Sequence, residues 1–262
     1  MSKSKKEKTV EIQMSLGNRS RFPISYFDSR NYIQHNLMLG DGLGPLLEFM
    51  DALPADRTKV NVRRAFEDGD YSVAHAEYEL GEWGRMVGFE VHRWENERIV
   101  EHWDNLQPMP AGLSPSGHSM TDGVSEATNI DSTQENKATI ERFTADVLIG
   151  KDTQSYALYF YSDQLIQHSP WCGDGSAAYM ASFIKDGTEV GAREYKKMHM
   201  LLGEGNMVLA ISEGTHCDEN GLIRRAAFYD LYRLEDGVIR EHWDVVETIP
   251  PRKEWRNENG KF

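Results

Sequence analysis

Cysteine is scarce in this sequence: only Cys172 and Cys217 occur among its 262 residues. The two lie far apart and form no C-x-x-C pattern, which excludes a disulfide framework and a zinc knuckle. So low a cysteine content is typical of proteins from a reducing compartment. We therefore expect a cytoplasmic protein.

Clusters of basic residues and long apolar runs are also missing. Lys and Arg number 29 against 42 Asp and Glu, and the formal net charge is −13. Proteins that bind phosphate backbones gather Lys and Arg on one surface, whereas lysines gather here only at the N-terminal tip, from Lys3 to Lys8. No run approaches the ~18 apolar residues of a membrane helix. Neither nucleic acid nor a membrane is expected as a partner.

Motifs that hold cofactors or metals are absent as well. The sequence contains no G-x-G-x-x-G, no P-loop and no G-x-S-x-G, and no H-x-x-x-H, H-E-x-x-H or Cys/His cluster. Zinc needs three or four ligands at defined spacings. A site assembled from His35, His75 and His102 is the one alternative. We expect no cofactor and no stoichiometric metal.

What the sequence does contain is a repeat. The tetrapeptide Glu-His-Trp-Asp at positions 101–104 recurs at 241–244, and Ile-Gln-His at 33–35 recurs at 166–168. A Gly-Asp-Gly triplet follows each Ile-Gln-His, beginning at Gly40 and at Gly173. The repeating unit is too long for a solenoid, so it represents a whole domain used twice.

The boundary between the copies is marked by composition. Residues 108–117 are rich in Pro, Gly and Ser, as in a linker. We predict a first domain at residues 1–110, a linker at 111–130 and a second domain at 131–262.

Each copy is predicted to have helices first and strands afterwards. A capping box at Ser132–Glu135 opens the second copy. In the first copy, helices are predicted at 7–16 and 43–50 and strands from 60 to 107. In the second copy, helices are predicted from 132 to 150, at 154–161 and at 177–183, and strands at 198–202, 207–212, 222–234 and 238–246. This order predicts an α+β fold with helices on one face of a curved antiparallel sheet.

The last hairpin concentrates polar side chains. If residues 235–237 form a three-residue loop, Asp230 falls opposite His242, and Asp244 falls opposite Phe228. Because side chains alternate along a strand, Asp230, Tyr232, His242 and Asp244 all project from one face.

The same count in the first copy places Glu90, His92, His102 and Asp104 on one face. A carboxylate in an apolar cavity has a raised pKa, which makes it a competent general base near neutral pH. The alternatives are a structural histidine–acid pair that fixes the hairpin, or a face that is simply hydrated.

Three further histidines are candidates for the same cavity. His35 and His168 each precede a Gly-Asp-Gly turn and could reach the mouth of a cavity. His75 lies in an alternating strand, where the second copy carries Ile211. An isolated histidine of this kind is more often a structural hydrogen-bonding group, so both roles stay open.

Several of these motifs together resemble the SnoaL-like family. The resemblance rests on residues 32–36, 73–75, 90–93 and 99–104 and extends over both copies. That family belongs to a superfamily of cone-shaped α+β folds, which also includes nuclear transport factor two, scytalone dehydratase and ketosteroid isomerase. Its named polyketide cyclases close a ring by an intramolecular aldol reaction without a cofactor. The resemblance implies that Asp104 and Asp244 stand at the position of their aspartate base.

The chain departs from the family pattern in ways that distinguish its two copies. Relatives usually read Q-H-N-P, whereas Leu37 follows Asn36 in the first copy and Ser169 follows His168 in the second. Ile211 also replaces the strand histidine. The first copy is therefore predicted to be the more competent site.

These observations predict two tandem cone domains packed as an intrachain pseudo-dimer, which could form further homo-oligomers. The expected function is cofactor-independent aldol condensation, cyclisation or isomerisation of a small apolar carbonyl compound. The candidate catalytic residues are Asp104, Asp244, His102, His242, Glu90 and Asp230, and the candidate substrate-binding residues are Tyr32, His35, His75, His92, His168, Trp103 and Trp243. The alternative is a non-catalytic ligand-binding or scaffold protein of the same fold. Asp104→Asn and Asp244→Asn are both expected to leave folding nearly unchanged, because amide and carboxylate are almost isosteric.

Overall fold

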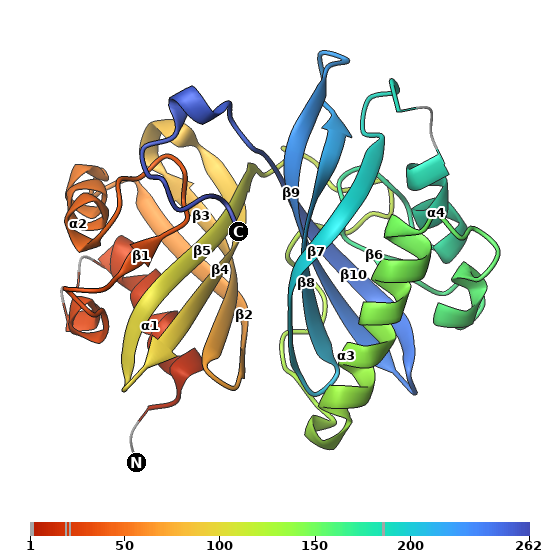
Figure 1. Cartoon of the computed structure of the whole chain (residues 1–262), viewed down its shortest axis with the longest axis horizontal. Coiled ribbons are helices and arrows are strands. Elements are labelled where there is room, and N and C mark those ends of the chain that lie inside the picture. Colours follow the sequence, from red (N-terminus) through yellow and green to blue (C-terminus); the bar gives the residue numbers. More distant parts are fainter. Residues whose placement is uncertain (1–2, 19, 21, 185–186) are drawn as a thin grey trace. The chain divides into compact units, whose positions relative to one another are not determined.

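The computed structural model describes residues 3–18, 20, 22–184 and 187–262. The chain divides into two compact units (Figure 1). Unit 1 comprises Met1–Met109 together with Pro250–Phe262, and unit 2 comprises Pro110–Ile249.

Each unit contains one sheet with the same strand order. The sheets have the orders β1-β5-β4-β3-β2 and β6-β10-β9-β8-β7. Unit 1 is built from α1 (Lys5–Asn18), β1 (Ile33–Gln34), α2 (Leu43–Ala52), β2 (Thr58–Asp68), β3 (Tyr71–Leu80), β4 (Arg85–Glu95) and β5 (Arg98–Pro108). Unit 2 is built from α3 (Thr133–Arg142), a π-helix (Phe143–Ile149), β6 (Ile166–Gln167), α4 (Ser176–Ile184), β7 (Arg193–Glu204), β8 (Met207–Cys217), β9 (Ile223–Glu235) and β10 (Val238–Thr248).

The predicted α+β class and its duplication are confirmed by this shared topology. One detail differs from the prediction, because each sheet is mixed. The two-residue strand β1 pairs in parallel with β5, and β6 pairs in parallel with β10. The parallel strand brings the Ile-Gln-His motif beside the Glu-His-Trp-Asp motif, so that Gln34 lies next to His102 and Gln167 next to His242.

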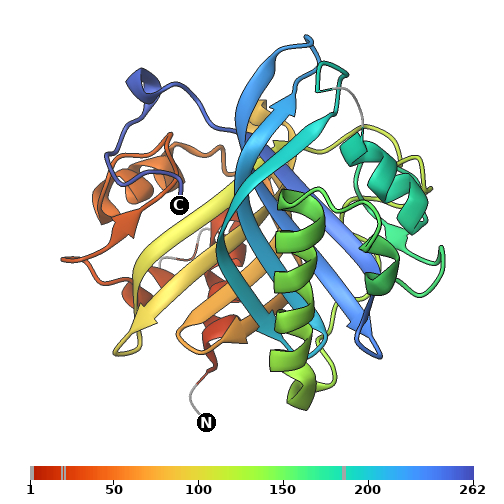
Figure 2. The same cartoon turned by 45° about the vertical axis from the view of Figure 1, so that its right-hand side comes forward.

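Helices cover one face of each sheet. In unit 1, α1 packs on β2 and β3. In unit 2, α3 lies across β7 and β8, as Figure 2 shows. The buried side of α1 is largely polar, and the Thr9 hydroxyl lies 2.7 Å from that of Ser72. The helix therefore adds polar groups as well as apolar cover to the face on which the candidate acids lie.

The core of unit 2 contains a large apolar cluster, and smaller clusters lie in the described part of unit 1. The buried cluster of unit 2 includes Phe143, Tyr179, Phe228 and Tyr232. Among the described residues, no helix is long and apolar enough to cross a membrane.

The two long hairpins turn in the same way. Positive φ angles at Asn96 and Glu97 (47° and 64°), and at Asp236 and Gly237 (50° and 77°), are typical of two-residue turns with a right-handed strand twist. An extra residue follows each turn, Val100 in β5 and Arg240 in β10, where the register shifts.

The bulge corrects the register predicted for the last hairpin. Asp244 is paired with Asp230, and His242 with Tyr232. The three-residue loop was wrong because the turn has two residues and the additional residue sits in the strand instead. The total shift is even, so the predicted set of residues still shares one face.

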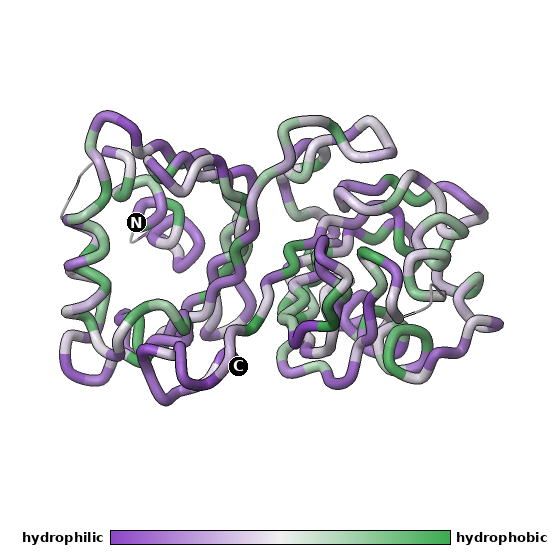
Figure 3. The backbone as a smooth tube through the Cα atoms, turned by 90° about the horizontal axis from the view of Figure 1, so that it is seen from above, coloured by the Kyte–Doolittle hydropathy of each residue, from purple (hydrophilic) through white to green (hydrophobic). Residues whose placement is uncertain are grey.

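The extents of the two units differ from the predicted domains. Residues 110–130 pack as part of unit 2, and the C-terminal segment Pro250–Phe262 packs as part of unit 1. Figure 3 shows that this last segment is mostly hydrophilic. It is held by hydrogen bonds, since the Asn257 side-chain amide donates to the carbonyl oxygens of Asn36 and Leu39 at 2.8 and 3.0 Å.

Two local predictions in unit 2 were also wrong. Ser132 makes no capping hydrogen bond, and Thr133 Oγ1 instead accepts one from the Gly205 amide at 2.8 Å. The helix predicted at 154–161 is a single 3-10 turn, Tyr156–Tyr159. The Thr133 hydroxyl thus meets a turn that lies far along the chain, which the local sequence does not show.

Candidate functional site

The face of the unit 1 sheet that the helices cover carries the predicted acids and histidines. Glu90 is paired with Asp104 across β4 and β5, and His92 with His102. The Thr9 hydroxyl of α1 lies 3.2 Å from His92 Nδ1, which places this row of side chains beneath the helix.

A chain of hydrogen bonds runs along this face. The Tyr78 hydroxyl donates to Glu90 Oε1 at 2.8 Å, and Glu90 Oε2 lies 2.7 Å from His102 Nε2. His102 Nδ1 donates to Gln34 Oε1 at 2.8 Å. Because the glutamine oxygen fixes a proton on Nδ1, the remaining proton lies between Nε2 of His102 and the carboxyl of Glu90.

The electrostatics of Glu90 and His102 favour a shared proton. Burial raises the pKa of Glu90, and the charge of Asp104 adds to that increase. Burial alone would lower the pKa of His102, but its hydrogen bond to Glu90 and the charges of Glu90 and Asp104 outweigh that effect and raise it. The two groups are joined by a hydrogen bond of 2.7 Å, along which a proton can move.

Asp104 lies beside this pair and is only 4% exposed. The side-chain amide of Asn36 donates to its Oδ2 at 2.5 Å. Lys261 Nζ, from the C-terminal segment, lies 3.6 Å from its Oδ1. Within the described part of the chain, that Oδ1 accepts no hydrogen bond. Asp104 is therefore a buried carboxylate with one oxygen oriented and the other facing a cation at a distance.

Unit 2 builds a similar chain with different residues. Asp230 lies 3.1 Å from His242 Nε2, and His242 Nδ1 lies 2.9 Å from Gln167 Oε1. The tyrosine that contacts the acid comes from another strand. The Tyr195 hydroxyl, on β7, donates to Asp230 at 3.0 Å.

The tyrosine and a smaller residue have exchanged places between the units. Tyr78 on β3 is paired with Val60 on β2, whereas Gly214 on β8 is paired with Tyr195 on β7. The phenol therefore enters from neighbouring strands in the two units and reaches the acid in both. Burial raises the pKa of both tyrosines, so the hydroxyls stay protonated and donate.

Asp244 differs most from its counterpart Asp104. Arg193 Nη1, from β7, lies 2.5 Å from Asp244 Oδ2, with side chains only 3% and 1% exposed. Burial by itself would raise the pKa of Asp244, but the charge of Arg193 overcomes it and lowers the pKa. The counterpart of Arg193 in unit 1 is Thr58, because Thr58 precedes Val60 on β2 by two residues as Arg193 precedes Tyr195 on β7. Asp244 is held as an ion by Arg193, whereas the ion pair described for Asp104 is with Lys261 at 3.6 Å.

His35, Trp103 and their counterparts lie on the opposite face of the sheets. His35 Nε2 lies 2.9 Å from Glu101 Oε1, and the ring stacks on Trp103 at 4.7 Å between centroids. Arg93 Nε donates to the other oxygen of Glu101 at 2.7 Å. Glu101 and Trp103 alternate with His102 and Asp104 along β5, so the two groups project oppositely.

Unit 2 repeats this second network. His168 lies 2.9 Å from Glu241 and stacks on Trp243 at 4.7 Å, and Arg233 donates to Glu241 at 2.6 Å. Burial alone would raise the pKa of Glu241, but its hydrogen bonds to His168 and Arg233 outweigh burial and lower the pKa. The structure thus does not bring His35, His168 or the two tryptophans together with Asp104 or Asp244.

The other candidates fall on both faces. His75 lies on the face opposite the acids, where Arg64 Nη1 is 2.5 Å from its Nδ1. Tyr32 lies near the acids, because its hydroxyl accepts a hydrogen bond from Gln34 Nε2 at 3.0 Å. His92 lies there too and stacks on His102 at 5.0 Å.

Sequence reasoning missed four residues that shape the two sites. Tyr78, Tyr195, Arg193 and Lys261 carried no motif. Tyr195, Arg193 and Lys261 each lie 35 or more residues from the acid that they contact, whereas Tyr78 lies 12 residues from Glu90, on a different strand. Asn36 was noticed only as part of a family pattern. A comparison of the two copies strand by strand, which shows Thr58 against Arg193, is the signal that could have identified the arginine.

Among the described residues, three groups of side chains have donor atoms within 4.8 Å of one another, as metal ligands require. Two are the acid sites just described, Glu90 with His102 and Asp104, and their unit 2 counterparts. In unit 1 both ring nitrogens of the histidine are already hydrogen-bonded, to Gln34 and Glu90. The third group contains His118, Asp122 and His168.

Comparison with known proteins gives structural relatives only. No protein-family model matches the sequence, and no curated protein is similar to it. Similar solved structures include a protein described as a ketosteroid isomerase from Kribbella flavida (17% identity, 47% of this chain and 87% of that one, TM-score 0.36). A SnoaL-like polyketide cyclase from Jannaschia sp. is similar (16% identity, 47% and 92%, TM-score 0.36), as is an LEH-like epoxide hydrolase from M. tuberculosis (16%, 44% and 85%, 0.35).

Each of these structures is aligned with less than half of this chain. Similarity at this level does not identify a reaction or a substrate.

Proposed function

We propose that unit 1 catalyses cofactor-independent proton abstraction from a small apolar carbonyl compound, leading to aldol-type ring closure or isomerisation. The observation that carries the proposal is the environment of Asp104. This buried carboxylate lies beside the hydrogen-bonded Glu90–His102 pair, and among the described residues no arginine forms an ion pair with it. A desolvated carboxylate with an adjacent proton-transferring pair is the arrangement that general acid–base catalysis requires.

In this proposal each residue has a defined task. Asp104 takes a proton from the carbon next to the carbonyl group, and the electron pair moves to the carbonyl oxygen to form an enolate. The ammonium group of Lys261 or the imidazolium of His102 stabilises that negative charge. Asn36 orients the base through its hydrogen bond to Oδ2.

Unit 2 is proposed to be the weaker or inactive partner. A carboxylate that must remove a carbon-bound proton needs a pKa near the working pH, and the ion pair with Arg193 lowers the pKa of Asp244 instead. The same ion pair is the observation that favours the second candidate function, in which the chain binds a small apolar ligand or acts as a scaffold without catalysis.

Exchange of carbon-bound protons with solvent tests the proposal without knowledge of the final product. A panel of small cyclic and aromatic ketones is incubated with the full chain in D₂O, and deuterium incorporation is followed by NMR. Asp104→Asn should reduce the exchange rate by a factor on the order of 100 or more, as expected for loss of a general base.

Two controls make the result interpretable. Asp244→Asn should reduce exchange less, provided that circular dichroism shows the variant folded at the assay temperature. Full activity of a folded Asp104→Asn variant would refute the catalytic role of Asp104. An absence of exchange in the wild type over the whole panel, together with saturable binding of one of the ketones, would favour the ligand-binding alternative.

A further inference from the structure

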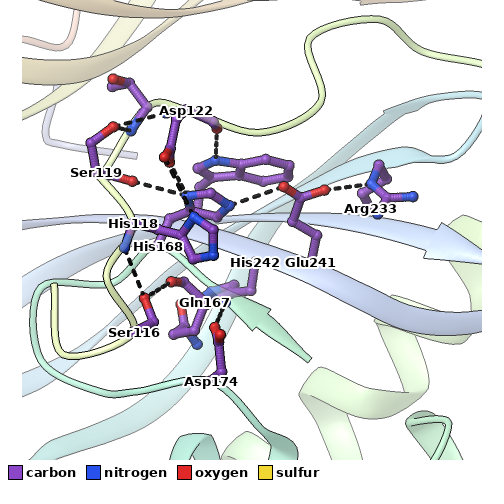
Figure 4. A network of polar contacts seen from close by, with 12 residues as sticks. Ser116, His118, Ser119, Asp122, Gln167, His168, Asp174, Arg233, Glu241 and His242 are labelled. Carbon is purple, nitrogen blue, oxygen red and sulfur yellow. Dashed lines mark hydrogen bonds and ion pairs between the residues drawn. The ribbon is translucent and has the colours of Figure 1, made fainter. Parts of the chain in front are cut away.

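The group formed by His118, Asp122 and His168 lies in unit 2, outside the acid sites. His118 and Asp122 belong to the segment between residues 110 and 130, and His168 follows β6. Figure 4 shows the two imidazole rings and the carboxylate of Asp122 directed toward one another. His168 Nδ1 lies 2.7 Å from Asp122 Oδ1, and His118 Nδ1 lies 3.4 Å from Asp122 Oδ2.

A backbone oxygen lies beside the same three side chains. The carbonyl oxygen of Ser119 lies 2.9 Å from His168 Nδ1. Ligand atoms that share a metal at bonds of about 2.0–2.1 Å stand roughly 3–3.4 Å apart. The separations of 2.7 and 3.4 Å from Asp122 to the two imidazole nitrogens, and of 2.9 Å from Ser119 to His168, are close to that spacing.

The outer contacts of His168 match those of a metal-bound histidine. Its Nε2 lies 2.9 Å from Glu241 Oε1, and Arg233 holds the other oxygen of Glu241 at 2.6 Å. A carboxylate that accepts the proton of one ring nitrogen leaves the other nitrogen as the ligand and fixes the orientation of the ring. Here the nitrogen opposite Glu241 is Nδ1, which faces His118 and Asp122.

Unit 1 provides an internal comparison. His35 makes the same contacts on its Nε2 side, with Glu101 and Trp103. On its Nδ1 side the partner is the carbonyl oxygen of Gly260, at 2.9 Å. In the described part of unit 1, no grouping of histidine and carboxylate donors forms around His35. The additional histidine and carboxylate of unit 2 are thus not needed for the shared His–Glu–Arg network.

We propose that His118 Nδ1, His168 Nδ1 and the Asp122 carboxylate bind a divalent transition metal ion of the Zn²⁺ class, with the Ser119 carbonyl oxygen or water as the fourth ligand. Two imidazoles and one carboxylate suit Zn²⁺, Co²⁺ or Ni²⁺ better than Mg²⁺ or Ca²⁺, which prefer oxygen ligands alone. The ion fastens residues 110–130 to the sheet of unit 2.

The sequence concealed this site because its ligands follow no recognised spacing. His118 and Asp122 are four residues apart in the sequence, but the third ligand, His168, comes much later in the chain, after α3, the π-helix and β6. Without the ion, His168 donates its Nδ1 proton to Ser119 or Asp122. Metal binding therefore releases a proton and weakens as the pH falls.

Titration with the metal alone tests the proposal. The full chain is prepared without an affinity tag, treated with EDTA, dialysed, and titrated with ZnCl₂ by calorimetry and in thermal melts. We expect one Zn²⁺ per chain and a rise in melting temperature that EDTA reverses. Co²⁺ should give a spectrum without thiolate-to-metal charge transfer, since both cysteines lie outside the proposed site. Failure to bind, or a thiolate band, overturns the proposal.

Variants identify the ligands. His118→Gln is suitable because the side chain is 37% exposed, so its replacement does not disturb the core. It should weaken Zn²⁺ binding by at least ~10-fold, and Asp122→Asn should do the same. His199→Gln is the matched control, since His199 lies outside the proposed site, 3.6 Å from the carboxylate of Glu213. Unchanged affinity in a folded His118→Gln variant, or equal weakening in His199→Gln, overturns the assignment.

Discussion

Replacing Asp244 by Asn probes the buried ion pair of unit 2. The substitution leaves the guanidinium group of Arg193 buried, at 3% exposure, without its negative partner. Removing one member of a buried pair costs about 3–5 kcal/mol of unfolding free energy. The asparagine oxygen can still accept a hydrogen bond from Arg193, so we expect the lower end, about 3 kcal/mol.

The equivalent change in unit 1 should cost much less. In Asp104→Asn the lost cation is Lys261, 3.6 Å from the carboxylate, rather than an arginine at 2.5 Å. The charge of Asp104 also helps to raise the pKa of Glu90, so its removal relieves repulsion between two acids. We expect a cost of about 1 kcal/mol, which is typical of a single substitution. The sequence alone predicts the same small effect for both variants.

Hydrogen exchange read by mass spectrometry distinguishes the two units, because peptides from β9 and β10 report on one and peptides from β4 and β5 on the other. The melting temperature of unit 2 should fall by roughly 6–12 °C in Asp244→Asn. The double variant Arg193→Met/Asp244→Asn should recover much of that loss, since no unpaired charge remains. Wild-type stability of Asp244→Asn, or an equal loss in Asp104→Asn, would refute this account of the two aspartates.

Two further predictions concern the acid stability of unit 2 and the attachment of the C-terminal segment to unit 1. The pKa of Asp244 is lowered in the folded state, so the stability it contributes is complete above the ordinary carboxyl pKa of about 4 and is lost as the pH falls through the lowered value. Urea denaturation at a series of pH values should therefore show an acid-dependent loss in unit 2 that is smaller in Arg193→Met, and an unchanged pH slope would contradict the ion pair. Asn257→Ala should destabilise unit 1 by about 1–3 kcal/mol, because two backbone carbonyl oxygens lose a buried donor. Asn220→Ala, at an exposed turn, is its control. If peptides from β4 and β5 were equally protected from hydrogen exchange in both variants, Asn257 would not be what holds the C-terminal segment on unit 1.

The sequence by itself determined the duplication, the α+β order of elements and the face on which the acids lie. These features depend on local rules. A repeated tetrapeptide shows a repeated domain, turn residues mark the hairpins, and alternation along a strand places Glu90 and Asp104 on the same side. The bulges at Val100 and Arg240 changed the partners across the hairpins without changing that side, because the shift was even.

Only the tertiary structure decided which cation each acid meets. The carboxylates of Asp104 and Asp244 stand in identical tetrapeptides, yet one faces Lys261 at 3.6 Å and the other Arg193 at 2.5 Å. Along the chain, Lys261 lies more than 150 residues from Asp104, and Arg193 lies more than 50 residues from Asp244. Contacts of this kind are set by strand order and by the path of the chain after its last strand. The pKa of a buried carboxylate depends on these charges far more than on its sequence neighbours. For that reason two equal motifs can carry different chemistry.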